Sequence, residues 1–324
     1  MHSTAIAILS LILVAPGSLL GQAWLPQRGE GSIGLTYMNI GTSDHLLSSG
    51  LPQDRGPLQQ NVVTAGVLYG ITDRFAVSAE IPYIDSKFTL KPGLAPNAHD
   101  LISKIDDGRY RGTFQDFRVN FKFNAISGPV MLSPFFEVVI PSHQYVTFGH
   151  AAPGRYEREY HIGTHIGRLL DPILPHCYVD LSYSYALVQQ VAGISPNKSN
   201  IDLEIGYILK PSITVRGLGS VQKTMAGLES PVSPDSPYFP VHDRLERGQY
   251  SRIGGGITYS VHRNFDIYFL VVSTLSGKNV QAFTAPAVGV NWTFHTRKSR
   301  EIVIPQRASA TGSALGARIP AISE

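Results

Sequence analysis

The segment from Phe117 to Ala125 constrains the fold of this chain more than any other. In it, large apolar residues alternate without exception with charged or amide residues, in the order Phe-Arg-Val-Asn-Phe-Lys-Phe-Asn-Ala. Successive side chains of a β-strand point to opposite faces of the sheet, so the segment predicts a strand with one apolar and one polar face. Comparable segments recur along the chain at very unequal intervals. This rhythm is typical of a barrel in a lipid bilayer, with apolar residues toward lipid and polar residues toward the lumen.

The same alternation, read between clusters of turn-forming residues, predicts twelve strands. An even number of strands returns the chain to the side on which it started. The expected strands lie near residues 31–40, 61–71, 74–84, 113–125, 130–141, 157–169, 177–189, 199–209, 212–223, 249–261, 264–274 and 283–294. Together they predict an all-β fold, a closed antiparallel transmembrane β-barrel.

The connections between these strands alternate between short and long. Short turns rich in Gly, Pro, Asp, Asn and Ser follow every second strand, and longer segments join the others. Transmembrane barrels show this asymmetry, with short periplasmic turns and long extracellular loops. Segments 85–112 and 225–248 are the best candidates for a lid or selectivity loop, and surface shielding alone is the alternative. The long outer segments are 41–60, 85–112, 142–156 and 225–248, and two shorter ones are 190–198 and 275–282.

The two ends of the chain differ from the barrel in composition. Residues 1–23 contain an apolar run and end in the small residues Gly21-Gln22-Ala23, which predicts a cleaved signal peptide. A membrane anchor would need about 20 apolar residues, and Pro-Gly-Ser at 16–18 interrupts the run. The predicted barrel spans residues 24–294. Residues 295–324 lack alternation and are polar, which predicts a disordered C-terminal tail.

Composition and motifs argue against several classes of function. Only 16% of residues are charged and the formal net charge is +3, which gives little reason to expect a nucleic-acid partner. The sequence contains no G-x-S-x-G elbow, P-loop or H-E-x-x-H motif, so we expect no enzyme, and no cofactor or metal is implied. A lipid hydrolase embedded in a barrel remains the rival, because catalytic residues can come from distant positions. The neighbours Ser142 and His143 would point to opposite faces if extended.

Ionisable residues fall on the inward face of the predicted strands. Charges at membrane depth persist only where they face water or each other, so this set either lines a pore or forms a paired plug. We favour a network of paired charges over a selective ligand site. The residues expected to line the lumen are Glu80, Asp116, Arg118, Lys122, Glu137, Glu159, His161, His165, Asp180, Asp202, Glu204, Arg216, Arg252 and Asp266.

Glu159, His161 and His165 form the most site-like cluster in this set. On a strand they share one face, and the two histidines lie about 13 Å apart along it. At this distance the two histidines of a strand cannot bind one metal ion together. We interpret them as histidines of the lumen rather than as a zinc pair.

Four prolines lie within or beside predicted strands, at Pro82, Pro134, Pro141 and Pro286. Each removes a donor from the hydrogen-bond ladder, so we expect a bulge or a strand end at each position. A further hypothesis is that bulges near Pro82 and Pro141 open a lateral gap through which an apolar substrate reaches the membrane.

Four segments resemble a known bacterial family. They are Ala23–Gly31, Tyr69–Phe75, the pair Asp106–Tyr110 and Gly112–Asp116, and Val290–Phe294. Together they are similar to the outer-membrane barrels grouped with phenol meta-pathway degradation transporters. The resemblance implies passive passage of small compounds, including aromatic or apolar ones, and a closing strand recognised by the barrel-assembly machinery.

The expected function is accordingly an outer-membrane channel or transporter, exported through its signal peptide. Its expected partners are outer-membrane lipid, a small-molecule solute and the barrel-assembly machinery. The alternatives are a barrel-embedded lipid hydrolase and a structural barrel without transport. The tail after Phe294 departs from the family's pattern.

Overall fold

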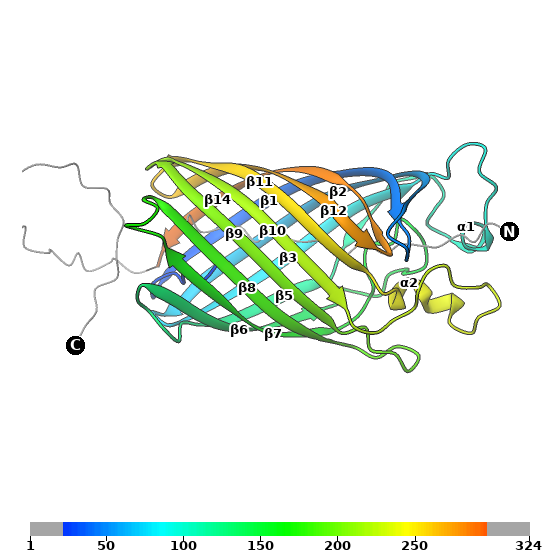
Figure 1. Ribbon diagram of the computed structural model, residues 1–324, viewed down its shortest axis with the longest axis horizontal. Coiled ribbons are helices and arrows are strands. Elements are labelled where there is room, and N and C mark those ends of the chain that lie inside the picture. The colour runs from blue at the N-terminus through cyan, green and yellow to red at the C-terminus, as the bar shows by residue number, and fades with distance from the viewer. Residues whose placement is uncertain (1–21, 297–324) are drawn as a thin grey trace, which may run out of the picture.

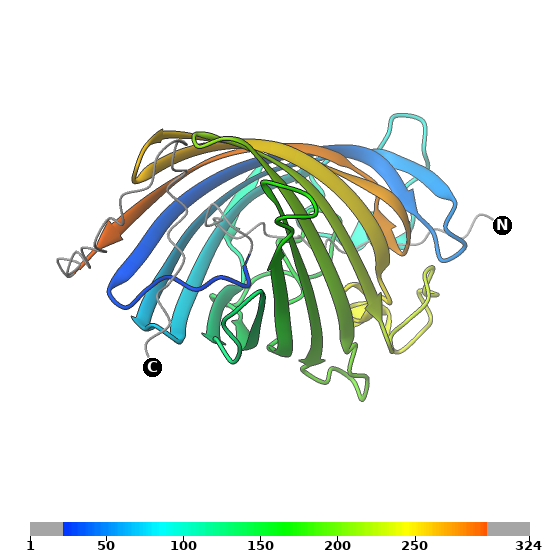
Figure 2. The same ribbon diagram turned by 60° about the vertical axis from the view of Figure 1, so that its left-hand side comes forward.

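The computed structural model describes residues 22–296, and these form one antiparallel sheet that closes on itself (Figure 1). Closure is made by β1 (Glu30–Leu46), which pairs with β2 on one side and with β14 on the other. Apart from the short β4 and β13, strands that follow one another in the chain pair with each other, and the long strands are tilted (Figure 2). The expected twelve-stranded closed barrel is therefore confirmed.

Twelve strands form the barrel wall, and two short strands, β4 and β13, extend its sheet. The remaining strands are β2 (Pro52–Thr72), β3 (Phe75–Phe88), β4 (Arg111–Phe114), β5 (Phe117–Phe123), β6 (Val130–Ile140), β7 (Glu159–Leu169), β8 (Cys177–Val188), β9 (Lys198–Lys210), β10 (Ile213–Thr224), β11 (Gln249–His262), β12 (Phe265–Lys278), β13 (Val280–Gln281) and β14 (Thr284–His295). The short additions are β4, which pairs with β3, and β13, which pairs with β1.

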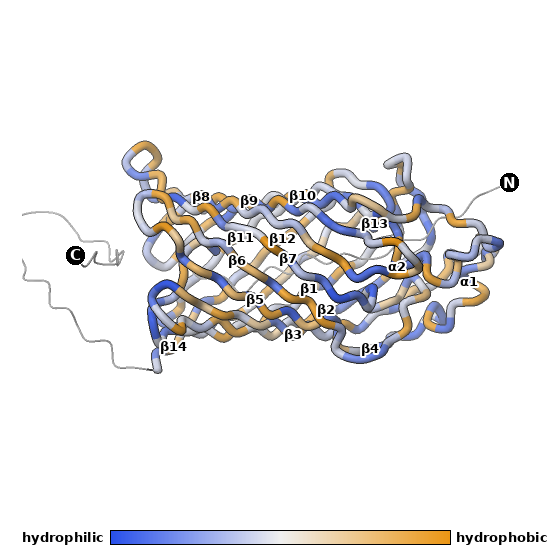
Figure 3. The backbone as a smooth tube through the Cα atoms, turned by 90° about the horizontal axis from the view of Figure 1, so that it is seen from below, coloured by the Kyte–Doolittle hydropathy of each residue, from blue (hydrophilic) through white to orange (hydrophobic). Residues whose placement is uncertain are grey.

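Burial along the strands is the reverse of that in a soluble protein. In β5, Phe121 and Phe123 are exposed while Asn120 and Lys122 between and beside them are buried. A similar alternation runs along most of the long strands, and it produces the mixed colouring of the wall in Figure 3. A wall that presents apolar side chains outward and polar ones inward fits lipid outside and a polar lumen inside.

The two ends of the barrel differ in the length of their connections. The long segments carry α1 (Ala98–Ile102), the 3-10 helix η1 (Phe239–Val241) and α2 (His242–Leu245), and both α-helices lie at the same end in Figure 1. The opposite end has tight turns such as 211–212 and 263–264. Within residues 22–296 every helix is too short or too polar to cross a membrane.

Segment 41–60, expected as a long outer loop, is mostly strand. β1 continues to Leu46 and β2 starts at Pro52, so only residues 47–51 connect them. Backbone pairing from Thr42 with Leu58 to Leu46 with Pro52 carries the hairpin beyond the barrel rim. Polar composition had suggested a loop, but the ladder satisfies the backbone groups and Leu46 and Leu58 bury apolar area. Segment 275–282 is likewise largely strand.

The expected strand 113–125 is broken at residues 115–116, which separates β4 from β5. Pro82 of β3 lies opposite this break. On one side of Pro82, β3 pairs with β5 as far as Glu80. On the other side, β3 pairs with β4 from Tyr83 onward. The backbone N–H of Gln115 donates to the Pro82 carbonyl at 2.9 Å. Pro82 has no backbone N–H to donate. It lies opposite the break between β4 and β5, where no ladder hydrogen bond from that N–H is needed.

The other three prolines also lie where a ladder has ended, rather than in a bulge of their own strand. Pro134 pairs toward β7, while the β5–β6 ladder stops one residue away at Phe135. Pro286 pairs toward β12, and the β1–β14 ladder stops at Ala287. Pro141 follows the last residue of β6. Each proline therefore has one side on which no donor is required.

Two inward tyrosines lie against glycines of the neighbouring strand. Tyr178 is paired in register with Gly206, and Tyr268 with Gly289. A Cβ atom on either glycine would collide with the facing ring. The hydroxyl of Tyr178 donates to Glu204 at 2.5 Å, which holds the ring in that place. These are positions where only glycine leaves room for a ring inside the barrel.

The ends of the described chain lie close to the short-turn rim. His295, expected in the tail, is the last residue of β14, and the Thr296 N–H donates to the Gly29 carbonyl. The rest of the expected tail and residues 1–21 of the expected signal peptide lie outside the described residues.

Candidate functional site

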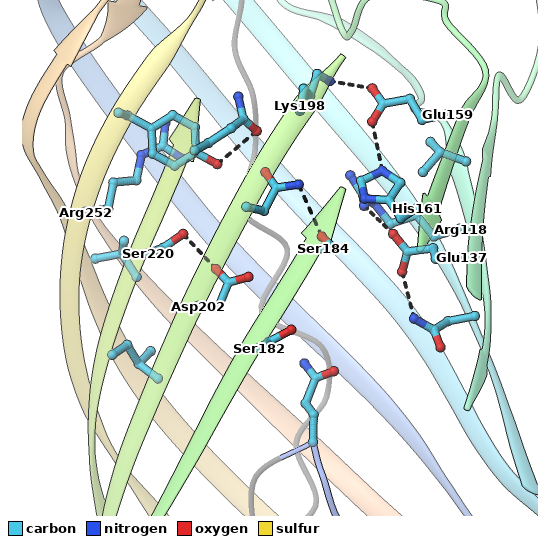
Figure 4. A pocket seen from close by; sticks show the side chains of 18 of the residues that line it. Arg118, Glu137, Glu159, His161, Ser182, Ser184, Lys198, Asp202, Ser220 and Arg252 are labelled. Atoms are coloured by element: carbon cyan, nitrogen blue, oxygen red, sulfur yellow. Dashed lines mark hydrogen bonds and ion pairs between the residues drawn. The ribbon is translucent and has the colours of Figure 1, made fainter. Parts of the chain in front are cut away.

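A cavity of about 310 Å³ lies inside the barrel (Figure 4). Strands from β3 to β12 contribute to its wall, and residues 153–155 of the β6–β7 loop also line it. Strand alternation places these side chains inward, because the alternate residues of the same strands face outward. The cavity is therefore the natural place to look for a solute site.

Ten of the residues expected in the lumen line this cavity. They are Asp116, Arg118, Glu137, Glu159, His161, His165, Asp180, Asp202, Glu204 and Arg252. Four others lie elsewhere on the strands. Glu80 is paired in register with Arg118, Lys122 contacts Gln22, Arg216 lies 3.9 Å from Glu204, and Asp266 accepts a hydrogen bond from Ser260.

One wall of the cavity carries a chain of paired charges. Arg118 Nη1 lies 2.9 Å from Glu137 Oε1, and Asn120 donates to the other oxygen of the same carboxylate at 3.2 Å. Further along, Glu159 accepts from Lys198 and lies 2.9 Å from His161 Nε2. These neighbouring pairs appear together in Figure 4. Each carboxylate thus has a cationic or hydrogen-bonding partner, as buried charges require.

The facing wall combines Arg252 with the ring of Tyr250, and Phe283 packs against the same guanidinium without lining the cavity. The Arg252 guanidinium lies 3.9 Å from the ring centroid of Tyr250 and 4.6 Å from that of Phe283. Such stacking stabilises an arginine in a partly apolar setting. Beside it Ser220 donates to Asp202 at 2.7 Å, and the apolar side chain of Leu218 also lines the cavity. The cavity therefore offers both polar and apolar surface to a solute.

The first described residues enter the lumen from the short-turn end. The Ala23 N–H donates to Asp180 at 2.5 Å, and Ser133 Oγ donates to the Ala23 carbonyl at 2.7 Å. Lys122 Nζ lies 2.8 Å from the Gln22 side chain. Asp180 also lies 3.5 Å from His165 Nδ1. His161 and His165 therefore have different acidic partners, consistent with their separation along the strand.

The β6–β7 loop folds inward over the cavity from the other end. Gln115 donates to the Pro153 carbonyl, and Tyr145 donates to Asp116 at 2.5 Å. The guanidinium of Arg244 donates to the carbonyls of Arg155 and Tyr156, both at 2.9 Å. This loop is tied to the strand break on one side and to α2 on the other.

Two ionisable side chains of this loop are buried without a hydrogen-bond partner in residues 22–296. They are Arg155 and Glu157, which are 5% and 1% exposed. Burial raises the pKa of Glu157 to about 7, and the positive charge of Arg155 opposes that rise. Glu157 therefore changes its charge near neutral pH.

Sequence reasoning missed several residues of the cavity. Lys198 is the first residue of β9, one position before the expected strand, so strand parity was not applied to it. Arg155 lies outside the strands, where alternation gives no direction. Gln115 has outward parity in the expected strand 113–125, but it lies in the break between β4 and β5 and faces the cavity. Tyr250 and Gln222 are inward residues without formal charge, whereas all the residues expected in the lumen are ionisable. Parity alone would have found these last two.

Ser142 and His143 correct an expectation made for an extended chain. The loop bends here, so Ser142 Oγ lies 2.8 Å from His143 Nδ1. Ser142 Oγ also lies 3.0 Å from the Phe114 carbonyl, and the other ring nitrogen of His143 lies 2.9 Å from Thr113 Oγ1. The Thr113 hydroxyl thus lies where a Ser-His-Asp triad would have a carboxylate to orient the histidine.

Comparison with solved structures places the fold among outer-membrane channels. An outer membrane channel from Pseudomonas putida F1 matches 87% of this chain and 100% of its own, with a TM-score of 0.64 at 12% identity. The NanC porin covers 81% of this chain and 98% of its own, with a TM-score of 0.47 at 10% identity. The P. putida toluene transporter TodX covers 85% and 92%, with a TM-score of 0.41 at 9% identity. No family model matches, and no curated protein matches by sequence.

Proposed function

We propose that this chain is an outer-membrane channel for the passive passage of small compounds. The observation that carries the proposal is the lumen cavity inside an inside-out closed barrel, where charged, aromatic and aliphatic side chains face one space. A structural barrel has no need for such a space, since paired plugs can pack tightly. The fold shared with the P. putida channel supports the same function.

The cavity supports a small solute with both apolar and polar parts. Its volume of about 310 Å³ is at the lower end for small-molecule sites. Tyr250 presents a ring beside Arg252, while Asp202 and Ser220 present oxygen atoms. A compound with one aromatic ring and one polar substituent would satisfy both surfaces. The family resemblance of the sequence points to the same class.

The charge of the cavity favours cations over anions. Four arginine or lysine side chains line it against six aspartates and glutamates. A lumen with an excess of carboxylates attracts cations and repels anions of equal size. We therefore expect neutral or cationic aromatic solutes to pass faster than their carboxylate analogues.

A flux panel in liposomes tests the proposal. Purified barrel is reconstituted, and entry of phenol, an aromatic amine, benzoate, a short fatty acid and potassium chloride is compared with entry into protein-free vesicles. We expect the largest protein-dependent rise for the aromatic amine and phenol, and a smaller one for benzoate. Equal permeability of protein-loaded and protein-free vesicles to every solute would leave a structural barrel as the better reading.

The hydrolase alternative rests on the hydrogen bond between Ser142 and His143. Because His143 meets the Thr113 hydroxyl rather than an acid, we expect no lipid turnover by the purified chain. Release of fatty acid from phospholipid vesicles that disappears in Ser142→Ala, and persists in Ser133→Ala, would establish the enzyme instead.

We also propose that the chain is exported to the bacterial outer membrane after cleavage behind Ala23. A new amino terminus at Trp24 would remove the contacts that Ala23 makes with Asp180 and Ser133 inside the lumen. Amino-terminal sequencing of the protein extracted from outer membranes should start at Trp24. A start at Met1, or recovery in the periplasmic fraction, would contradict this proposal.

A further inference from the structure

Three outer segments meet in a buried cluster of histidines and aspartates, which we call the outer cluster. It consists of His99 and Asp100 of α1, His150 of the β6–β7 loop, and His242 and Asp243 of α2. His99, His242 and Asp243 are 1%, 2% and 1% exposed. Side chains of this type are rarely buried together unless they are paired or bind a metal ion. The cluster lies outside the lumen cavity.

The histidine of α2 is held in one tautomer. Its Nδ1 atom meets the Phe239 carbonyl, which can only accept a hydrogen bond, so Nδ1 carries the proton. In the neutral ring, Nε2 then presents a lone pair. A ring nitrogen oriented in this way by a backbone carbonyl is the usual arrangement of a histidine that binds a metal ion.

This lone pair faces a carboxylate oxygen. His242 Nε2 lies 3.1 Å from Asp243 Oδ1, and neither atom has a hydrogen-bond partner in the described chain. Two acceptors at this distance repel each other in a buried site, where an unpaired polar atom already costs free energy. A cation between them would remove both costs. The pair therefore points to a ligand.

The remaining ligand comes from α1. His99 Nε2 lies 3.1 Å from Asp243 Oδ2, so the carboxylate lies between the two imidazoles. Ligand atoms of His99, His242 and Asp243 all lie within 4.8 Å of one another. Bonds of about 2.0 Å in a tetrahedral zinc site place ligand atoms about 3.3 Å apart. Each imidazole lies 3.1 Å from one of the two Asp243 oxygens, which is close to this spacing.

We propose that His99, His242 and Asp243 bind a divalent transition-metal ion, with Zn²⁺ as the ion that fits this donor set best. Imidazole nitrogens with one carboxylate suit zinc better than the all-oxygen preference of Ca²⁺ or Mg²⁺. The ion would join α1 to α2, and Asp243 already accepts the Gly149 N–H of the β6–β7 loop at 2.8 Å. The site would thereby fasten three outer segments over the mouth of the barrel.

A hydrogen-bonded cluster without metal is the competing explanation. A hydrogen bond from His99 Nε2 to Asp243 Oδ2 at 3.1 Å would satisfy the contact between these two residues. It leaves His242 Nε2 and Asp243 Oδ1 without a hydrogen-bond partner in the described chain, and this remaining contact favours the metal.

Cobalt titration tests the site directly. The full chain is purified with a tag that contains no histidine, treated with EDTA, and titrated with Co²⁺, whose visible absorption reports low coordination number and nitrogen ligands. We expect one equivalent to bind, and Zn²⁺ to displace it. Asp243→Asn and His242→Ala should each weaken binding at least tenfold. His143→Ala, an exposed histidine of the same outer face, is the matched control and should bind as the unaltered chain does.

A second measurement uses only the unaltered chain, in case a variant does not fold. Hydrogen exchange of segments 89–110 and 225–248 is compared in Zn²⁺ and in EDTA, and we expect slower exchange of both with Zn²⁺. Absence of a stoichiometric Co²⁺ spectrum, or binding of equal strength in Asp243→Asn when that variant is folded, would overturn the proposal. Unchanged exchange in Zn²⁺ would also overturn it. Solute flux is not a readout in either experiment, so failure of the channel proposal would be seen separately.

Discussion

The strength of the ion pair between Lys198 and Glu159 reports whether the lumen wall around it is dry or hydrated. The two side chains are 7% and 11% exposed. Removing one partner of a buried pair costs about 3–5 kcal/mol because it leaves an uncompensated charge. His161 still contacts the carboxylate, so Lys198→Met should cost about 3 kcal/mol, at the low end of that range. Glu159→Gln should cost about 2 kcal/mol.

The variant that carries both Lys198→Met and Glu159→Gln distinguishes a dry lumen wall from a hydrated one. If the wall is dry, Lys198→Met with Glu159→Gln should be more stable than the sum of the single changes by at least about 1.5 kcal/mol. A hydrated pair would give a coupling energy of about 0.2–1 kcal/mol. The free energy of unfolding is measured by urea titration in lipid vesicles, followed by tryptophan fluorescence.

The exposed pair of Lys91 and Asp54 is the matched control, because its side chains are 49% and 40% exposed. The cycle of Lys91→Met and Asp54→Asn should give a coupling energy below about 1 kcal/mol. If the Lys198 and Glu159 changes add to within about 0.5 kcal/mol, as distant sites do, the inference of a dry paired wall is wrong.

Three further changes test other parts of the structure. Gly206→Ala should destabilise the barrel by about 1–3 kcal/mol, because the added methyl group meets the ring of Tyr178. The control Gly217→Ala, whose methyl group would have no atom nearer than 4.0 Å, should change stability little in the same urea titration. Glu157 has a folded pKa of about 7 above its ordinary 4.5, so it makes the closed loop less stable as pH rises from 4.5 to 7. Channel opening in planar bilayers should therefore increase between pH 5 and 8, and Glu157→Gln should abolish that increase. If the break opposite Pro82 is a lateral exit, Pro82→Val and Pro141→Val should slow uptake of apolar solutes while the heat-modifiable gel mobility stays normal, and unchanged uptake would refute the exit.

Strand alternation predicted most of the barrel because one rule acts at every position. A side chain such as Phe121 points outward and its neighbour Lys122 points into the lumen, so each residue carries evidence about its own direction. The rule fails at the outer rim. There the hairpin of β1 and β2 has polar residues on both faces, so segment 41–60 looks like a loop in the sequence although it is paired.

The outer cluster could not be predicted for a different reason. His99, His150 and His242 lie in three segments separated by 51 and 92 residues of sequence, and none has a motif spacing with the others. Long loops have no period that fixes the direction of a side chain. Only the closed barrel brings their ends together, since it places the outer loops around one mouth. By contrast, the spacing of His161 and His165 in the sequence indicated a cluster, but the two histidines contact different acids, Glu159 and Asp180.

The β6–β7 loop connects the outer cluster to the lumen cavity over a few residues. Gly149 donates to Asp243 at one end of this stretch, and Arg155 lines the cavity at the other. Arg244, which follows Asp243 directly, holds the Arg155 carbonyl at 2.9 Å. Because α2 thus contacts both ends of the stretch, a movement of α2 away from the mouth must break contacts at the cavity as well as at the cluster. Whatever binds the outer cluster therefore also stabilises the arrangement in which Arg155 and Glu157 are buried above the lumen.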